Sequence, residues 1–354
     1  MYESFYGLTG KPFQLNPDPA FFFRSKGHSR AFAYLQYGLF QSEGFVVVTG
    51  EVGAGKTTLV RSLLGQVDPR KVVAAQLVST QLDAEDLLRA VASAFGMRSK
   101  SVEKSQLLLE LEAFLVAVST TGKRTLLIVD EAQNLSSRAV EELRMLSNFQ
   151  LANRGLLQTF LVGQPELRET MRSPHMQQLR QRVIGSYHLG PLEAGETKDY
   201  IEHRLKCVGW NGDPSFEPDA MIAIHRLTGG IPRRINVLAD RLLLGGYLAE
   251  KHALKLPDVD AVAREMGEEF GAAFDLPVLR PGTEGATAGS APAAPQGAHV
   301  AGPSSTSPTK LESFMVSADD RLARVEQTLG LILKLLERMA ANISAAKPDE
   351  RTGS

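Results

Sequence analysis

The stretch that decides the fold is Thr49–Val60, which reads TGEVGAGKTTLV. It follows a short apolar run, FVVVT (45–49), and leads into TLVRSLLGQ (58–66), which has helical spacing. Gly50–Thr57 matches the pattern G-x-x-x-x-G-K-[ST] in full, in the strand–loop–helix context that the pattern requires. A glycine-rich turn without a ligand is the alternative, but ordinary residue frequencies give such a match by chance in about 1% of chains this long. The stretch therefore predicts a phosphate-binding loop.

The chemistry of this loop follows from its residue types. Glycines let the backbone turn with its N–H groups pointing inward, around phosphate oxygens. The N-terminus of the following helix adds a partial positive charge. Lys56 can reach the β- and γ-phosphates, and the hydroxyl of Thr57 can bind Mg²⁺. ATP and Mg²⁺ are therefore the expected ligands. The residues expected to contact the nucleotide are Gly50, Glu51, Val52, Gly53, Ala54, Gly55, Lys56, Thr57 and Thr58.

A second element of such a site is an acid at the end of a neighbouring strand, and TLLIVDEAQ (125–133) supplies two. Asp130 is expected to accept a hydrogen bond, either from a water molecule bound to Mg²⁺ or from the Thr57 hydroxyl. Glu131 is placed where it could polarise an attacking water, a role that nucleotide binding alone does not need. The alternative is that the strand simply ends there and the acids cap a helix. The phosphate-binding loop upstream favours the catalytic interpretation.

Short apolar runs alternate with helical stretches between Phe45 and Pro191, as in a parallel sheet buried on both faces. From Ala194 to about Phe270 the spacing is helical throughout, which predicts a small all-helical second domain. The expected fold is α/β, a P-loop NTPase with a parallel five-stranded sheet and a C-terminal helical lid domain. The expected strands are 45–49, 72–78, 125–130, 157–163 and 185–190.

Beyond the helical region the composition changes abruptly. Between Pro281 and Thr309 almost every residue is Ala, Gly, Pro, Ser or Thr, which is typical of a flexible linker. A heptad-like apolar stripe follows, indicating either a coiled-coil-like helix that binds a second copy or a partner, or an amphipathic helix that folds back on the globular part. The stripe consists of Leu322, Val325, Leu329, Ile332, Leu336, Met339 and Ile343.

Composition excludes several classes of function. With 39 Lys and Arg against 40 Asp and Glu, the formal charge is -1, which gives no global attraction to nucleic acid or anionic lipid. The single cysteine, Cys207, allows no intrachain disulfide. The start, MYESFYGLTGKPF, lacks the pattern of a signal peptide, and no run approaches the ~18 apolar residues of a membrane span. No spacing typical of a protein-held metal or of a Ser-His-Asp or Cys-His hydrolase occurs.

Several separated motifs resemble those of AAA+ ATPases, from about Phe5 to Phe270. They are GEVGAGKTT, LLIVDEAQ, FLVGQPEL, LRQRV and GGIPRRIN, in that order. Within AAA+, the segments FYGLTGKPFQLNPDPAFFF, DEAQNL and VGQPELRE resemble the general secretion pathway protein A (ExeA-like) ATPases, in particular the ATPase linked to exosortase and PEP-CTERM exopolysaccharide loci. Secretion pathway A proteins often continue into a membrane span and a peptidoglycan-binding domain. This sequence has the linker and the heptad stripe instead, which argues against a cell-wall role.

The resemblance implies roles for further residues. Gln164, just after the strand that ends at Gly163, corresponds to sensor 1. Arg180 and Arg182 precede the last strand, where these ATPases carry the arginine finger that reaches a neighbouring subunit; Arg182 is preferred. Arg233 corresponds to sensor 2 of the helical domain, with Arg234 a weaker candidate.

The resemblance also places the adenine pocket between the N-terminal segment and the lid. Phe13, His28 and Tyr37 are candidates for lining it, with a place in the core as the alternative for each. The expected division of the chain is 1–44 (N-terminal segment contributing to the nucleotide pocket), 45–192 (AAA+ α/β core), 193–272 (helical lid), 273–310 (flexible linker), 311–345 (heptad helix) and 346–354 (disordered tail).

The resulting expectation is a cytoplasmic, Mg-dependent ATPase that assembles into a ring or partial ring. Its expected partners belong to envelope export or exopolysaccharide and PEP-CTERM protein production, and would hold it peripherally at the inner membrane. One alternative is an ATP-dependent DNA-binding regulator, similar to the ATPases that select transposition targets; the near-neutral charge disfavours it. The other is a nucleotide-switched adaptor with little turnover. The sequence also contains a basic stretch, which could form a subunit interface, a DNA-contacting face or only a solvated helix. It comprises Arg168, Arg172, His175, Arg180 and Arg182.

Overall fold

The computed structural model describes residues 1–270, apart from 42, 79–81, 99–102 and 153. All of these residues belong to one compact unit of the chain. The predicted linker (273–310), heptad helix (311–345) and tail (346–354) lie outside the described residues, as do the last two positions of the predicted lid.

A parallel five-stranded sheet forms the centre of the first domain, with the strand order β2-β3-β6-β1-β7. Strand β1 pairs in parallel with β6 and β7, and β3 pairs in parallel with β2 and β6. The parallel five-stranded sheet predicted from the sequence is thus confirmed, with each strand at or within two residues of its expected position. The strands are β1 (Phe45–Gly50), β2 (Val72–Val78), β3 (Arg124–Asp130), β6 (Gln158–Gly163) and β7 (Val183–Leu189).

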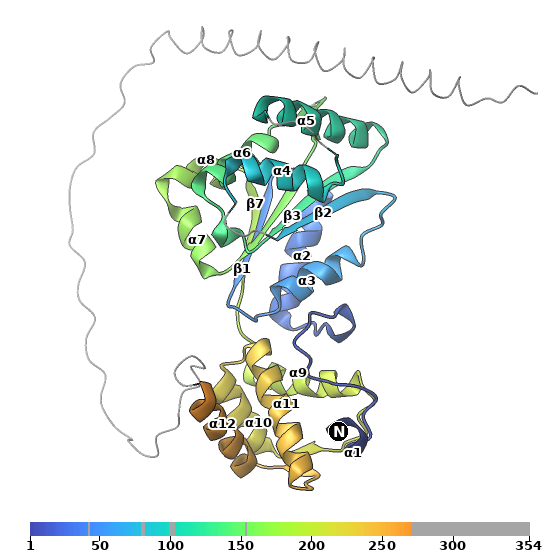
Figure 1. Cartoon of the computed structure of the whole chain (residues 1–354), viewed down its shortest axis with the longest axis vertical. Coiled ribbons are helices and arrows are strands. Elements are labelled where there is room, and N and C mark those ends of the chain that lie inside the picture. The colour runs from blue at the N-terminus through green and yellow to red at the C-terminus, as the bar shows by residue number, and fades with distance from the viewer. Residues whose placement is uncertain (42, 79–81, 99–102, 153, 271–354) are drawn as a thin grey trace, which may run out of the picture. The chain divides into compact units, whose positions relative to one another are not determined.

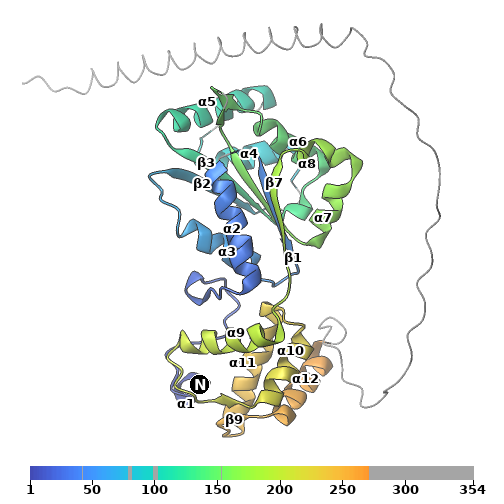
Figure 2. The same cartoon turned by 180° about the vertical axis from the view of Figure 1, so that it is seen from behind.

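Helices cover both faces of this sheet, as Figure 1 and Figure 2 show. Helices α2 (Lys26–Gln41) and α3 (Lys56–Leu64) pack on one face through a core cluster that includes Leu35, Leu59 and Phe160. The other face carries five helices around a larger cluster that includes Leu88 and Leu127. Burial on both sides explains why the three central strands, β1, β3 and β6, are largely continuous apolar runs rather than alternating ones. The five helices are α4 (Ala84–Ala94), α5 (Lys104–Thr120), α6 (Ser137–Leu146), α7 (Pro165–Arg172) and α8 (Gln177–Arg180).

Local sequence sets several helix ends. Asp83 accepts hydrogen bonds from the first-turn N–H groups of α4, and Ser136 accepts one from Ala139 in α6. Glu193 and Glu196 form a reciprocal capping box at the start of α9 (Ala194–Lys206). These caps satisfy N–H groups that have no partner within the helix.

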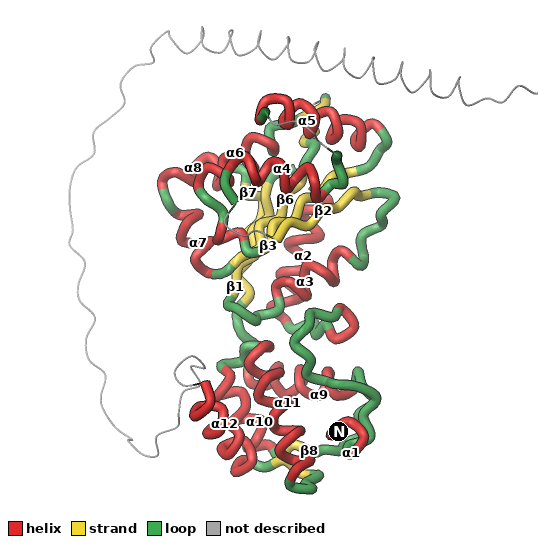
Figure 3. The backbone as a smooth tube through the Cα atoms, viewed as in Figure 1, coloured by secondary structure: helices red, strands yellow, loops and turns green. Residues whose placement is uncertain are grey.

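The second domain consists of four helices, but it is not helical throughout as predicted. Two short strands, β8 (Ser215–Phe216) and β9 (Ala253–Leu254), pair in parallel within this domain. Figure 3 labels β8 among the helices. Two residues per strand are too few to produce the alternating pattern by which strands are predicted. The same holds for the antiparallel pair β4 (Gln150–Leu151) and β5 (Arg154–Gly155) that precedes β6. The four helices are α9, α10 (Pro218–Thr228), α11 (Pro232–Leu248) and α12 (Leu256–Phe270).

The N-terminal segment belongs to both domains. It begins with α1 (Tyr2–Phe5), whose Tyr2 packs with Tyr6, Leu8 and Phe13 in the core of the helical domain. The chain then passes through the 3₁₀ turn η1 (Pro19–Phe21) before α2 joins the sheet. None of the helices in the described ranges combines the length and apolar character that a membrane span requires.

Candidate functional site

The carboxyl ends of three adjacent strands bring the predicted site together. Strand β6 lies between β1 and β3, so its end at Gly163 separates the end of β1 at Gly50 from the end of β3 at Asp130. The chain between β1 and α3 forms the glycine-rich loop, and α3 begins at Lys56. Ligands bind at this edge of a parallel sheet because loops and helix N-termini converge there.

Two loop glycines adopt backbone conformations that other residues take only with strain. Gly53 has φ +83° and Gly55 has φ +96°. A Cβ atom on Gly53 would lie 2.3 Å from Cβ of Arg233, and one on Gly55 would lie 2.8 Å from Nε2 of His28. This chain therefore needs glycine at both positions for two reasons, the turn itself and the close approach of distant residues, although of the two only Gly55 is a fixed glycine of the pattern.

Lys56 lies folded back onto the loop. Its ammonium donates hydrogen bonds to the carbonyl oxygens of Gly50 (2.7 Å) and Glu51 (3.0 Å). Burial lowers the pKa of Lys56, while the charges of Glu131 and Asp130 act in the opposite direction. The buried ammonium is therefore a strong site for phosphate oxygens, which would replace weak carbonyl partners with charged ones.

Thr57 and Asp130, the two residues that the sequence predicts to bind Mg²⁺, contact each other. The Thr57 hydroxyl donates to Oδ2 of Asp130 at 3.0 Å, and the backbone N–H of Glu131 donates to Oδ1 at 3.0 Å. Burial raises the pKa of Asp130, although both hydrogen bonds oppose the shift. A hydroxyl and a carboxylate are oxygen ligands that suit Mg²⁺, which in such sites is completed by water and nucleotide phosphates. The donor set therefore fits Mg-ATP.

Glu131 is held by two amides at the edge of the site. Nε2 of Gln133 and Nε2 of Gln164 both donate to its Oε2, at 2.6 and 3.1 Å. Burial acts to raise the pKa of Glu131, but these hydrogen bonds and the charge of Lys56 outweigh it, so the pKa is lowered. The residue has φ 53° and ψ 38°, a left-handed conformation that is strained for a side chain other than glycine. The carboxylate is therefore ionised at neutral pH and fixed in direction.

His28 supports the loop from the side of α2. Its Nε2 lies 3.1 Å from the carbonyl oxygen of Ala54, and its Nδ1 lies 2.8 Å from the Ser25 hydroxyl. A carbonyl can only accept, so Nε2 carries the proton and Nδ1 accepts from Ser25. Burial lowers the pKa of His28, which keeps the ring neutral and this pattern intact. His28 thus holds the loop backbone as well as lining the cavity.

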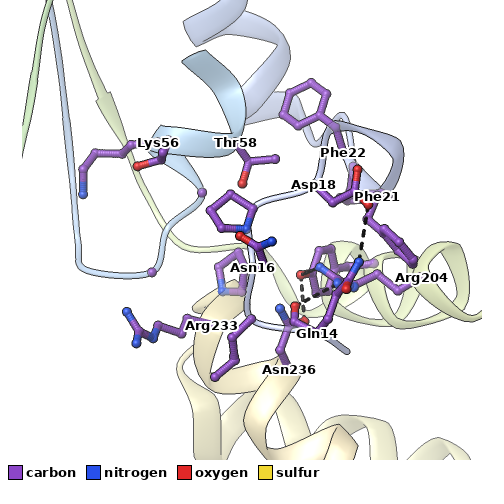
Figure 4. Close-up of a pocket in the computed structure, with 18 of the residues that line it drawn as sticks. Gln14, Asn16, Asp18, Phe21, Phe22, Lys56, Thr58, Arg204, Arg233 and Asn236 are labelled. Carbon is purple, nitrogen blue, oxygen red and sulfur yellow. Dashed lines mark hydrogen bonds between the residues drawn. The ribbon is translucent and has the colours of Figure 1, made fainter. Parts of the chain in front are cut away.

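One cavity joins the loop, the N-terminal segment and the helical domain (Figure 4). Arg233, at the start of α11, lines it, and its backbone N–H donates to the carbonyl oxygen of Gly53 at 3.1 Å. Asn236, one turn further along α11, accepts from the hydroxyl of Tyr200 at 2.8 Å. The cavity is therefore built from three parts of the chain that are far apart in sequence. From the N-terminal segment it is lined by Gln14, Leu15, Asn16, Pro17, Asp18, Phe21, Phe22, Phe23 and His28.

Two of the three aromatic candidates for the pocket lie elsewhere. Phe13 is 2% exposed in the core of the helical domain, and Tyr37 is 51% exposed on α2, where its hydroxyl accepts from Gln41. The aromatic character of both residues reflects packing or surface rather than a base pocket. Arg234 does not line the cavity either.

The two arginines before β7 lie outside this cavity. Nη1 of Arg180 donates to the carbonyl oxygens of Met171 (2.6 Å) and Ser173 (2.8 Å). Nη1 of Arg182 donates to the carbonyl oxygen of Ser147 at 3.1 Å and to its hydroxyl at 3.2 Å. Neither arginine serves the chain's own site, and a role in a neighbouring subunit's site stays a prediction.

Three residues that support the site have weak or no signals in the local sequence. Gln133 lies two positions after Glu131, and its place in DEAQ was the available hint. Arg204 and Tyr200 lie on α9, far in sequence from the loop, and no local pattern connects them to it. Nε and Nη2 of Arg204 donate to the carbonyl oxygens of Pro12 (2.5 Å) and Gln14 (3.1 Å), so this side chain fixes the segment that lines the cavity.

Comparison with known proteins agrees with this geometry. Residues 39–171 match the family model of an AAA domain. General secretion pathway protein A of Aeromonas hydrophila is 39% identical over 267 residues, which are 75% of this chain and 48% of that protein. The chain thus spans about half the length of this curated relative.

Solved structures with the same fold include the ORC2 protein of Aeropyrum pernix in its ADPNP-ADP complexes. It has a TM-score of 0.56 and 19% identity, covering 72% of this chain and 71% of that one. Cdc6p of Pyrobaculum aerophilum has a TM-score of 0.56 and 14% identity, covering 72% and 70%. Drosophila ORC bound to DNA has a TM-score of 0.53 and 15% identity, covering 72% and 64%. The chain therefore has a P-loop AAA fold, as predicted, and the AAA domain match supports ATPase activity.

Proposed function

We propose that this AAA protein hydrolyses ATP with Mg²⁺ and uses the cycle to act on partner proteins of a secretion-type system. The loop around Lys56 would bind the phosphates, Thr57 and Asp130 would hold Mg²⁺, and Glu131 would polarise the attacking water. Gln164 would sense the γ-phosphate, and Arg233 would bring the helical domain onto the nucleotide. Mg²⁺ supplies charge neutralisation between the phosphates when it is bound.

The observation that carries this proposal is the Thr57–Asp130 hydrogen bond beside an ionised Glu131. The bond fixes the two oxygen ligands at 3.0 Å from each other, next to the loop that would hold the phosphates. Glu131 extends from the adjacent residue and is held by amides rather than by a cation. Among the described residues, the contacts of this carboxylate are hydrogen bonds from neutral amides rather than an ion pair, so it remains available to a water molecule. A group in this role contributes about 10²–10⁴-fold to rate.

The test is steady-state ATP hydrolysis over a range of protein concentrations, with two variants that separate binding from chemistry. Lys56→Ala should abolish nucleotide binding, measured with a fluorescent ATP analogue. Glu131→Gln should retain binding and lose about 10²–10⁴-fold in kcat. If both variants hydrolyse ATP as fast as the wild type, the activity comes from something other than this site.

The partner system belongs to the same proposal at a finer level. We infer envelope export or exopolysaccharide production of the exosortase and PEP-CTERM type, with a cytoplasmic location that is peripheral at the inner membrane through partners. The support is the resemblance of the N-terminal, DEAQNL and VGQPELRE motifs and the name of the Aeromonas relative. Co-purification with neighbouring gene products from the native host, with and without ATP, tests this assignment.

Two other functions predict different outcomes in the same assays. A DNA-binding regulator would use exposed basic residues of the α7–α8 region, such as Arg168 and Arg172, with His175 beside them. Its retention on duplex DNA would require ATP and fall steeply with salt, because phosphate contacts release counterions. A nucleotide-switched adaptor would keep its function in cells after the Glu131→Gln substitution, because it does not depend on hydrolysis. The amide-held Glu131 favours the hydrolase over the adaptor.

A further inference from the structure

We propose that Gln133 is a positioning residue for ATP hydrolysis, which anchors one oxygen of Glu131 and ties it to Gln164 so that the other oxygen faces the attacking water. The inference rests on the proposed function and extends it to a residue for which that function names no role. Gln133 would touch neither nucleotide nor water, and would act only through its two neighbours.

The contacts of Gln133 use both ends of its amide. Nε2 donates to Oε2 of Glu131 at 2.6 Å, and Oε1 accepts from the backbone N–H of Gln164 at 3.0 Å. The Gln164 side chain closes the triangle by donating to the same Oε2 at 3.1 Å. One carboxylate oxygen therefore receives both amides, and no described residue donates a hydrogen bond to Oε1 of Glu131.

Packing fixes the amide of Gln133 in this orientation. Gln133 lies in the short 3₁₀ turn η2 (Ala132–Asn134), directly against the end of β6. A Cβ atom on Gly163 would lie 2.8 Å from Oε1 of Gln133, so the side chain contacts the strand backbone closely. Glu131 directly precedes the turn in a strained left-handed conformation, which persists only where surrounding contacts over-determine it. The two amides are such contacts.

The residue type matters because an amide is both donor and acceptor. Glutamate at position 133 would still accept from the Gln164 N–H, but would repel the Glu131 carboxylate. Methionine keeps the length and removes both hydrogen bonds. These two variants therefore separate the bond to Glu131 from the bond to Gln164.

The first experiment compares kcat, KM and nucleotide affinity. Gln133→Met should lower kcat about tenfold or more, part of the ~10²–10⁴-fold that a positioned proton-transfer group contributes. The KM for Mg-ATP and the affinity for a non-hydrolysable analogue should change less than about twofold, because Gln133 does not line the cavity. Gln133→Glu should lower kcat at least as much. Gln36→Met, at an exposed position on α2, is the matched control and should leave both unchanged.

The second experiment asks whether Gln133 acts through Glu131. In single-turnover assays, Gln133→Met should have no further effect in a Glu131→Gln background, since coupled residues are non-additive. An equal loss in both backgrounds would overturn the proposal, and so would an unchanged kcat for Gln133→Met in a chain that hydrolyses ATP.

The third measurement does not depend on turnover. Hydrogen exchange of the Gln164 amide should be about tenfold faster in Gln133→Met, the loss expected from one hydrogen bond. Unchanged exchange would remove the link to Gln164 and overturn the proposal. A wild type without ATPase activity would overturn the proposed function instead, and the exchange result would still decide whether Gln133 holds Gln164.

Discussion

At the scale of single residues, the site depends on side chains that bond different neighbours through both of their polar atoms. His28 bonds Ser25 on one ring nitrogen and the Ala54 carbonyl on the other. Gln133 does the same with its amide between Glu131 and Gln164. Satisfied networks of this kind hold reacting groups in one geometry, because each alternative orientation leaves a buried polar atom without a partner.

The clearest residue-scale prediction concerns Gly53. A Cβ atom there would meet Arg233 at 2.3 Å, in addition to the strain of φ +83°. Gly53→Ala should lower the free energy of unfolding by about 1–2 kcal/mol for the left-handed conformation and about 1–3 kcal/mol more for the overlap. It should also weaken nucleotide binding, because α11 can no longer approach the loop.

Gly122→Ala is the control for this prediction. Gly122 has φ +77° and open space around it, so alanine there carries the strain of the left-handed conformation alone. Thermal unfolding and nucleotide affinity should separate the two variants. Equal losses of stability, with nucleotide binding unchanged in both, would show that the contact between the loop and α11 has no consequence.

At the scale of elements, Arg204 of α9 connects the helical domain to the segment that lines the cavity. Its guanidinium donates to Pro12, Gln14 and the hydroxyl of Tyr200, and it lies 4.8 Å from the ring centroid of Phe21. The side chain is 6% exposed, so these bonds form away from water. A buried cation with carbonyl and hydroxyl partners holds two chain segments that sequence places far apart.

Arg204→Met should therefore destabilise the helical domain by about 3 kcal/mol, because it leaves one buried and one partly buried carbonyl group without donors. The single tryptophan, Trp210, belongs to this domain, and its Nε1 donates to the carbonyl oxygen of Pro214 at 3.0 Å. Its fluorescence during urea unfolding measures the change. Arg226→Met, at an exposed position of α10, is the matched control. A midpoint that is the same in both variants would contradict the prediction.

At the scale of the whole molecule, we expect a second copy to complete the proposed site. Arg180 and Arg182 bond backbone carbonyls of their own chain and line no part of its cavity. If Arg182 serves a neighbour, Arg182→Ala should bind ATP normally and lose turnover, within the ~10³–10⁵-fold range of arginine fingers.

Mixing two inactive variants tests the assembly directly. A Lys56→Ala chain has an intact Arg182, and an Arg182→Ala chain has an intact nucleotide loop. Their mixture should hydrolyse ATP faster than either variant alone, since one chain supplies the arginine to the other. A mixture no faster than its components, with Arg180→Ala giving the same result, would remove the trans arginine from the mechanism.

Much of the fold could be predicted because its signals are local. The apolar runs gave the positions of the five strands of the sheet, and the G-x-x-x-x-G-K-[ST] pattern gave the loop between β1 and α3. Two-residue strands such as β8 and β9 were missed because a pairing that short leaves no periodicity. The sequence cannot separate Phe13 and Tyr37 from pocket residues, because an aromatic side chain has the same local pattern whether it is buried, exposed or lining a cavity.

The sequence by itself determined the phosphate-binding loop, the acids that follow β3 and the parallel sheet, since each depends on neighbours in the chain. Only the tertiary structure decided that His28 holds Ala54, that the N–H of Arg233 meets Gly53 and that Arg204 fixes Pro12. The first and third of these contacts join residues that are 26 and 192 positions apart in the sequence, and the contact of Arg233 joins the two domains. Their partners are selected by packing and by the need to satisfy buried polar groups, neither of which leaves a pattern in the local sequence.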